Sequence, residues 1–318
     1  MIDLEISNYN GKYTHLNTER SQNVRPIDLA RAMVQVGQGS WKDVFNLSKF
    51  RIGELVCKAF AFSNLERGNL ILQNRFNKLN QSEKTTISYY FGQGLTKLYS
   101  EKFLKIKWLF HVDDYIDLIQ FTNKGLSTSK ITVGKTKKIA NRPDLIGLER
   151  KNISHIFEAK GSSIKYDTSV MQHAINQVSQ IKTYNGVSPE TKTACYFDLS
   201  KKPIKGIIID PENGDDGIDI QLDEELLIKR YYSFFLENRQ YFSNSFRYKN
   251  LEFLITPVGM PSIYFGFDKR LLDMNVADLL SEKGLYYNTD TYLQNYSEDS
   301  EHVSLGLDGI ILVDERKF

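Results

Sequence analysis

The chain has 318 residues, of which 41% are hydrophobic, 25% charged and 12% aromatic. This length suffices for one large domain or two small ones, and the composition excludes a disordered or collagen-like protein. Cys57 and Cys195 are far apart in the sequence, which argues against a disulfide scaffold or a cysteine zinc site. The acidic N-terminus and the lack of a long apolar run predict neither a signal peptide nor a membrane helix. We therefore expect a cytoplasmic protein without membrane contact.

The net charge of +2 conceals an asymmetry along the chain. Residues 1–210 hold 31 Lys and Arg against 19 Asp and Glu, whereas residues 211–318 hold 10 against 20. The first part therefore carries a net charge of +12 and the second −10. Charge of one sign attracts partners of the opposite sign, so the basic part favours a polyanion such as nucleic acid. A solvated basic surface is the alternative interpretation.

The first 80 residues have a mainly helical pattern. Apolar side chains recur at three- and four-residue spacing after Pro26, at Leu29, Ala32, Met33 and Val36. The pattern continues over Phe45–Phe62. We expect residues 1–80 to form a helical N-terminal region.

Residues 81–210 predict a mixture of helices and strands. The two short apolar segments at 145–148 and 153–157 flank a charged tetrad, which indicates a hairpin. The elements expected in chain order are a helix over 81–104, strands at 108–112, 145–148 and 153–157, a helix over 168–184, and strands at 193–199 and 204–209. This order predicts an α/β domain.

The acidic remainder, residues 211–318, predicts an α+β extension. It begins with a turn-rich stretch, and the boundary near residue 210 depends on this stretch and on the change of charge. The elements expected after it are helices over 223–241 and 269–281 and strands at 251–255, 262–267 and 309–313. Because an acidic surface repels a DNA backbone, we expect this region to bind a protein partner, a second copy of the chain, or the basic part of its own molecule.

The sharpest motif joins Asp144, which follows Pro143, to the triplet Glu158, Ala159 and Lys160. The carboxylates of Asp144 and Glu158 and the carbonyl of Ala159 are hard oxygen ligands of the kind that Mg²⁺ prefers. Lys160 can orient or deprotonate an attacking water and offset phosphate charge. Since strand side chains alternate, Glu158 and Lys160 share a face, and a turn at 150–151 brings Asp144 close to Glu158.

Context distinguishes this triplet from the three other Glu-x-Lys triplets of the chain. Glu149 lies in the expected turn, and no strand precedes Glu190. Asp308 with Glu315 is the main rival, but the chain leaves no room for a helix after Glu315. Charged strand ends that only solvate a hairpin remain the structural alternative.

Taken together, these residues resemble the signature of the PD-(D/E)XK nuclease superfamily, over about residues 81–200. The resemblance implies a restriction-endonuclease-like mixed sheet flanked by helices, in the order helix, strands, helix, strand. It also implies a Mg²⁺-dependent nuclease, with Mn²⁺ as a possible substitute, and catalytic roles for Asp144, Glu158 and Lys160.

Two further features fit the same family. Many members carry a Glu or Gln on the helix before the first core strand, and Gln93 and Glu101 are the candidates for it. Exonuclease-like branches carry Gln-x-x-x-Tyr on the helix after the lysine, which Gln180 and Tyr184 match. The resemblance therefore implies catalytic roles for Gln93 and Gln180 and a nucleic-acid contact for Tyr184. Gln172 and Gln177 compete for the glutamine position, and a solvated polar helix face is the alternative.

A basic stretch precedes the motif, and we expect its side chains to contact phosphates without reading bases. The residues expected to do so are Lys124, Lys130, Lys135, Lys137, Lys138 and Arg142. The leading hypothesis is a Mg²⁺-dependent DNA endonuclease of a restriction or phage-defence system. The alternatives are a binding module that kept the fold but lost the chemistry, and a nuclease directed at RNA.

Overall fold

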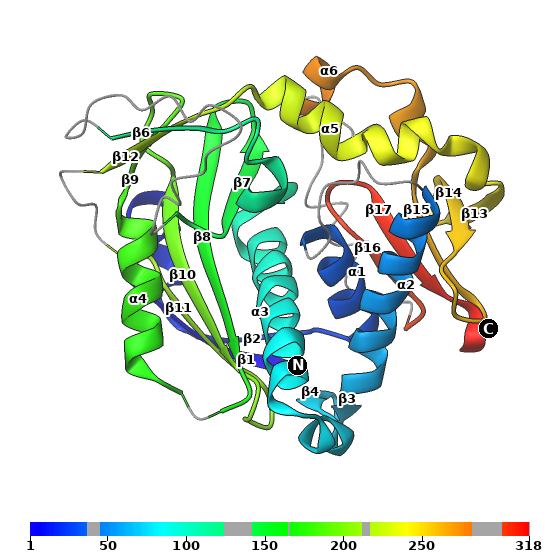
Figure 1. Cartoon of the computed structure of the whole chain (residues 1–318), viewed down its shortest axis with the longest axis horizontal. Coiled ribbons are helices and arrows are strands. Elements are labelled where there is room, and N and C mark those ends of the chain that lie inside the picture. The colour runs from blue at the N-terminus through cyan, green and yellow to red at the C-terminus, as the bar shows by residue number, and fades with distance from the viewer. Residues whose placement is uncertain (37–44, 124–141, 165, 212–216, 282–300, 318) are drawn as a thin grey trace.

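The structure, a computed structural model of the whole chain, has a mixed α/β fold around one large sheet (Figure 1). The residues that it describes are 1–36, 45–123, 142–164, 166–211, 217–281 and 301–317. Helices cover both faces of this sheet, and a second sheet lies beyond the helices of one face (Figure 1). The expected α/β class is therefore confirmed.

Seven strands form the central sheet, in the order β2-β1-β11-β10-β8-β7-β5. Their bounds are Ile2–Ser7 for β1, Glu19–Gln22 for β2, Trp108–His111 for β5, Leu145–Arg150 for β7, Ile153–Ser162 for β8, Thr191–Asp198 for β10 and Lys205–Ile209 for β11. β1 runs parallel to β11 and β8 runs parallel to β10, whereas the other neighbours are antiparallel. The sheet is therefore mixed.

Two helices cover the centre of this sheet from opposite sides. α3 (Gln81–Leu104) packs against β8 and β10 on one face, and α4 (Thr168–Ser179) packs against the same strands on the other (Figure 1). α3 begins with a capping box, in which the side chain of Asn80 accepts from the amide of Glu83 at 2.9 Å and that of Glu83 accepts from Asn80. A long, well-capped helix gives the sheet a fixed support.

Beyond α3 lie α1 (Pro26–Val36), α2 (Phe45–Phe62) and the second sheet, so that α1 is sandwiched between α3 and that sheet (Figure 1). The second sheet consists of β13 (Asn244–Tyr248), β14 (Leu251–Pro257), β15 (Ile263–Asp268), β17 (Ile310–Asp314) and β16 (Val303–Leu305). The remaining elements are β3 (Ser63–Glu66), β4 (Asn69–Leu72), β6 (Gln120–Asn123), β9 (Ile181–Tyr184), β12 (Ile218–Gln221), α5 (Glu224–Glu237) and α6 (Val276–Leu280).

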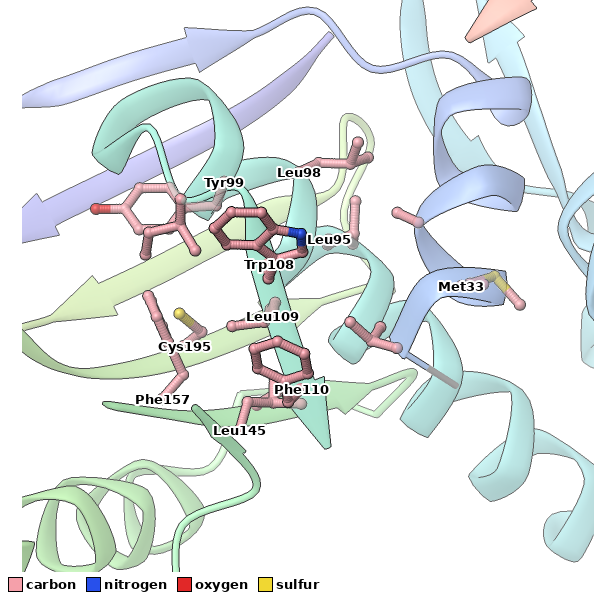
Figure 2. Packing of buried hydrophobic residues seen from close by; sticks show 14 of the residues in the cluster. Met33, Leu95, Leu98, Tyr99, Trp108, Leu109, Phe110, Leu145, Phe157 and Cys195 are labelled. Carbon is pink, nitrogen blue, oxygen red and sulfur yellow. The ribbon is translucent and has the colours of Figure 1, made fainter. Parts of the chain in front are cut away.

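The hydrophobic core is continuous from the central sheet through α3 to α1. Figure 2 shows Leu95, Leu98 and Tyr99 of α3 packed with Trp108 of β5 and with side chains of the neighbouring strands. The indole nitrogen of Trp108 donates to the hydroxyl of Tyr232 in α5 at 2.8 Å. The same cluster includes residues of all three expected regions, from Ile2 to Leu312. Residues 1–80 and 211–318 therefore pack on the core of residues 81–210.

The prediction that residues 1–80 form a helical region is wrong in part. β1 and β2 belong to the central sheet, and Ile2, Leu4 and Ile6 of β1 are buried between its neighbours. The predicted helix over 168–184 ends at Ser179, and Ile181–Tyr184 instead forms strand β9. The reason is a distant pairing, since β9 runs parallel to β12, which comes some 35 residues later. A tertiary contact thus overrides the helical pattern.

The acidic C-terminal part contacts the turn of the β7–β8 hairpin. The carboxylate of Glu224, at the start of α5, accepts from the amide of Asn152 at 3.1 and 3.3 Å, and Glu225 lies 3.8 Å from the ammonium of Lys151. The amide of Lys151 donates to the carbonyl of Leu280 in α6 at 3.0 Å. This region thus contacts the hairpin of its own chain, whereas a protein partner and a second copy stay predictions.

Candidate active site

The β7–β8 hairpin brings Asp144 and Glu158 face to face. Leu145 pairs with Phe157 in this antiparallel hairpin, so the next positions outward, Asp144 and Glu158, lie opposite each other. Opposed residues of two antiparallel strands project from the same face of the sheet. The expected hairpin is confirmed, with Asp144 one position nearer to Glu158 than a turn at 150–151 predicts.

A small network of contacts joins the motif residues. The amide of Asp144 donates to Oε2 of Glu158 at 2.9 Å, and the amide of Ala159 donates to Oδ2 of Asp144 at 3.2 Å. The ammonium of Lys160 lies 3.6 Å from Oδ2 of Asp144 and forms a close ion pair with Oε1 of Glu158. Asp144, Glu158, Ala159 and Lys160, predicted from the sequence, are thus brought together.

The charges of these groups are strongly perturbed. Burial, joined by the negative charge of Asp144, raises the pKa of Glu158 to about 7. Burial alone would lower the pKa of Lys160, but Asp144 and Glu158 outweigh it and raise that pKa above its ordinary value. Shifted pKa values of this kind are typical of functional sites. When two carboxylates lie close together, each disfavours the charged form of the other and so raises its pKa.

The close approach of α3 supports the strand that carries Glu158 and Lys160. A Cβ on Gly161 of β8 would stand 2.0 Å from the carbonyl oxygen of Ser88, and one on Gly92 would stand 2.5 Å from the amide nitrogen of Gly161. Only glycine permits this contact between helix and strand. Because Gly161 faces α3, alternation directs Glu158 and Lys160 toward the opposite face, which α4 covers.

Gln93, expected on the helix before the first core strand, lies on α3 and is fully buried. In the described part of the chain, its amide makes no hydrogen bond of ordinary length and angle, but it interacts with the hydroxyl of Tyr89 and lowers the pKa of that group. It neighbours Tyr89, one helical turn earlier, whose pKa responds to the charge of Asp144. The other candidate on this helix, Glu101, lies about two turns further along and forms an ion pair with Arg31 at 2.7 Å.

The expected pair of Gln180 and Tyr184 does not form a helical motif. Gln180 is the C-cap of α4, and Tyr184 is a buried residue of β9, where it is not available to nucleic acid. Gln177 instead reaches the candidate site, because its amide nitrogen donates to the carbonyl of Arg142 at 3.1 Å. Gln177 differs from Gln180 because it lies on the inner side of α4, one turn before the C-cap. This position in the helix is the signal that could have identified it from the sequence.

Most of the expected phosphate-contacting residues lie outside the described residues. These are Lys124, Lys130, Lys135, Lys137 and Lys138. Arg142 is described, and its guanidinium forms a close ion pair with Asp113, just after β5. This pair and the bond from Gln177 hold the chain two residues before Asp144.

The rival carboxylates do not form an equivalent site. Asp308 is fully buried in a network where it accepts from Gln35 at 2.5 Å and from the hydroxyl of Tyr231. Lys97 lies 3.9 Å from Asp308 and 3.1 Å from Glu101. Glu315 lies beyond β17, in a separate short helix. The carboxylate of Asp308 is therefore engaged inside the protein.

The donor set suits a hard divalent cation. No group of three or more His, Cys, Asp and Glu side chains able to hold a metal ion occurs among the described residues, and the motif offers two carboxylates and a main-chain carbonyl. A strand residue directs its amide and carbonyl to the same side, so the carbonyl of Ala159, whose amide bonds Asp144, also faces this carboxylate. Burial, and after it the negative charge of Asp144, raises the pKa of Glu158, and a bound cation would favour the charged form of this carboxylate.

No protein-family model, curated protein or solved structure matches this chain. Within the described ranges, no helix is long and apolar enough to cross a membrane.

Proposed function

We propose that the protein is a Mg²⁺-dependent nuclease that hydrolyses phosphodiester bonds of DNA, as an endonuclease of a restriction or phage-defence system. The observation that carries the proposal is the convergence of Asp144, Glu158 and Lys160 at the end of one hairpin, with distances of 2.9 to 3.6 Å between Asp144 and its partners. Two carboxylates and a lysine at one strand edge are what metal-assisted phosphodiester hydrolysis requires.

The arrangement of the surrounding elements supports this proposal. Among the elements of the central sheet and its two covering helices, α3 is followed by β5, β7 and β8, and β7 is antiparallel to both β5 and β8. Then come α4 and β10, which runs parallel to β8. The PD-(D/E)XK superfamily, which the motif resembles, has a core of this order. Fold likeness by itself does not imply activity, so the proposal depends on the site.

Asp144, Glu158 and the carbonyl of Ala159 would hold the metal, for which Mg²⁺ is the natural choice and Mn²⁺ a substitute. When bound, the metal supplies Lewis-acid polarisation of the phosphate and lowers the pKa of an attacking water. The protein supplies the rigid strand that presents these oxygens, together with the bond from Gln177 that holds the preceding chain. Because these oxygens are already held in place, no free energy is needed to arrange them during the reaction.

Lys160 would act as a cation that holds the water and the phosphate, more than as a base. Its pKa lies above the ordinary value because Asp144 and Glu158 outweigh burial, so the ammonium stays protonated at neutral pH. A charged ammonium beside the carboxylates offsets the developing negative charge on the phosphate. Of the two roles predicted for this lysine, orientation is the one that the electrostatics favour.

The test is a cleavage assay on supercoiled plasmid, linear duplex DNA and single-stranded RNA, each with Mg²⁺, with Mn²⁺ and with EDTA. We expect metal-dependent products from DNA with the wild-type protein, none with Glu158→Gln, and wild-type products with Glu149→Gln. Glu149 is the matched control because it belongs to a second Glu-x-Lys triplet on the same hairpin. Cleavage that survives EDTA or Glu158→Gln would contradict the proposal.

The same assay separates the two alternatives. A binding module that lost the chemistry would retain DNA in a mobility-shift experiment and produce no fragments with either metal. A nuclease directed at RNA would cut the RNA strand and leave both DNA substrates intact.

A further inference from the structure

On the α3 side of the sheet, near enough to Asp144 to respond to its charge, a tyrosine and a histidine form a hydrogen-bonded pair. The hydroxyl of Tyr89 on α3 lies 2.7 Å from Nε2 of His111, the last residue of β5. Their rings meet edge to face, with centroids 6.4 Å apart. Tyr89 is 40% exposed, and its bond to His111 lies at the surface of the protein.

The hydrogen bonds around His111 determine which atom carries the proton. The backbone amide of Asp113 donates to Nδ1 of His111 at 3.3 Å, so Nδ1 presents a lone pair. In a neutral imidazole the other nitrogen then carries the hydrogen, and Nε2 donates to the oxygen of Tyr89. The phenolic proton of Tyr89 is consequently directed away from His111. The amide of Gln93 lowers the pKa of Tyr89, as a donor to this oxygen does, so the proton remains available to an acceptor.

The electrostatic surroundings keep both groups neutral. Burial lowers the pKa of His111, as does Arg142, and these effects outweigh the opposite pull of Asp144 and Asp113. Burial and the charges of Asp144, Asp113 and Asp114 raise the pKa of Tyr89 and outweigh the opposite effect of the Gln93 side chain. Tyr89 therefore remains a protonated phenol at neutral pH.

A neutral donor suits this position better than a cation. Asp113 and Asp144 lie close by, and a cationic side chain there forms an ion pair, as Arg142 does with Asp113. A phenol held by a neutral imidazole keeps its donor free while adding no charge. The natural acceptor beside a cleavage site is a non-bridging phosphate oxygen, which only accepts hydrogen bonds.

Resting on the proposed function, we infer that Tyr89, oriented by His111, donates a hydrogen bond to a phosphate of the nucleic-acid strand next to the scissile bond. Tyr89 is then a substrate-binding residue and His111 its positioning residue. The contact reads the backbone and not the bases, so it acts on every sequence alike.

The first test compares Tyr89→Phe with Tyr90→Phe. The neighbouring Tyr90 is a matched control, because its hydroxyl bonds Arg51 on α2. We expect Tyr89→Phe to raise the KM for DNA about 3- to 10-fold with little change in kcat, the loss typical of one hydrogen bond, and Tyr90→Phe to leave both unchanged. An unchanged KM in Tyr89→Phe would overturn the inference.

The second test asks whether His111 acts through Tyr89. We expect His111→Ala to weaken DNA binding and His111→Gln, whose amide can accept from Asp113 and donate to Tyr89, to restore it. In a double-mutant cycle, Tyr89→Phe should add little to His111→Ala. Additive effects, or equal losses in both His111 variants, would contradict the positioning role.

A binding measurement distinguishes a failure of the Tyr89 contact from a failure of the nuclease proposal. Fluorescence anisotropy of a labelled duplex, measured in Glu158→Gln protein, reports the Tyr89 contact without any cleavage. If the wild-type protein cuts nothing but Tyr89→Phe still weakens binding 3- to 10-fold, the nuclease proposal fails and the contact stands. If the double variant Tyr89→Phe, Glu158→Gln binds the duplex as tightly as the Glu158→Gln protein, or if neither protein binds it, the contact is refuted.

Discussion

Two clusters of acidic and basic side chains in this protein contain the same kinds of charged group but differ in their charge balance and in their burial. In the buried cluster of Arg31, Lys97, Glu101 and Asp308, two cations meet two carboxylates, and each of these side chains is at most 2% exposed. In the hairpin cluster of Asp144, Glu158 and Lys160, the described part of the chain provides one ammonium for two carboxylates, and Asp144 and Lys160 are 21% and 28% exposed.

The difference is visible in the pKa of one glutamate from each cluster. For Glu101 burial would raise the pKa, but Arg31 and Lys97 outweigh it and lower the value below the ordinary range. For Glu158 burial and Asp144 win, and the pKa rises to about 7. The balanced, closed cluster joins α1 and α3 to the C-terminal sheet, whereas the unbalanced, partly open one is the cluster for which we propose a divalent cation.

The largest effect is expected from the hairpin cluster, on activity. Asp144→Asn, Glu158→Gln and Lys160→Ala should each reduce the cleavage rate by about 100- to 10,000-fold, the range for loss of a positioned catalytic group. Single-turnover kinetics on a labelled duplex measures the rate, and circular dichroism checks that the fold is retained. Wild-type rates in Asp144→Asn or Glu158→Gln would place the site elsewhere.

The buried cluster should respond in stability instead. Glu101→Gln removes the buried carboxylate that pairs with both Arg31 and Lys97, which costs about 3–5 kcal/mol of unfolding free energy. The matched control is Glu190→Gln, which breaks the exposed pair with Lys12 and should cost at most about 1 kcal/mol. Urea titrations measure both values. Equal losses of unfolding free energy in the two variants would show that burial of the cluster does not increase its contribution to stability.

A pH experiment distinguishes the two glutamates by sign. Because the pKa of Glu158 is raised to about 7, the folded state binds more protons than the unfolded state between about pH 4.5 and 7, and stability falls as pH rises through this range. Glu158→Gln should therefore raise the Tm by a few degrees at pH 8 in EDTA and change it little at pH 4.5. A lower Tm at pH 8 would contradict the raised pKa of Glu158.

For Glu101 the sign is the reverse. Its lowered pKa contributes stability that is present above pH 4.5 and is lost as the pH falls through the folded-state value. The stability difference between wild type and Glu101→Gln should therefore shrink on acidification. A difference that grows below pH 4.5 would show that burial outweighs the pairing with Arg31 and Lys97.

The smallest effect is expected from Gln177, which holds the carbonyl of Arg142 at 3.1 Å. Gln177→Ala should reduce kcat about 2- to 10-fold without raising KM, because the loss of one hydrogen bond loosens the chain before Asp144. Gln180→Ala, at the C-cap of the same helix, is the control and should leave kcat unchanged. Equal effects of the two substitutions would remove the distinction between them.

The part of the site that could be predicted is the part that depends on local structure. The hairpin of Asp144 and Glu158 follows from two apolar segments around a charged turn, and strand alternation places Lys160 beside Glu158. α3 begins and ends where its pattern predicts, at Gln81 and Leu104. Such features need no knowledge of distant residues.

The features that were missed depend on distant pairing or on a short pattern. α4 ends at Ser179 because the following residues pair with β12, so Gln177 and not Gln180 faces the chain before Asp144. β1 could have been recognised, since Ile2, Leu4 and Ile6 alternate with polar residues, the pattern of a half-buried strand. Its place beside β11, some 200 residues later, could not, because no local signal encodes that pairing.

The most direct test of the central claim is the binding of Mn²⁺, a paramagnetic substitute for Mg²⁺, followed by electron paramagnetic resonance. We expect wild-type protein and Glu149→Gln to bind the ion with the same affinity, and Asp144→Asn and Glu158→Gln each to weaken binding at least about tenfold. Glu101→Gln, measured on the folded fraction, should bind as wild type does, because its cluster is closed. Binding that survives both hairpin substitutions would contradict the assignment of the metal to Asp144 and Glu158.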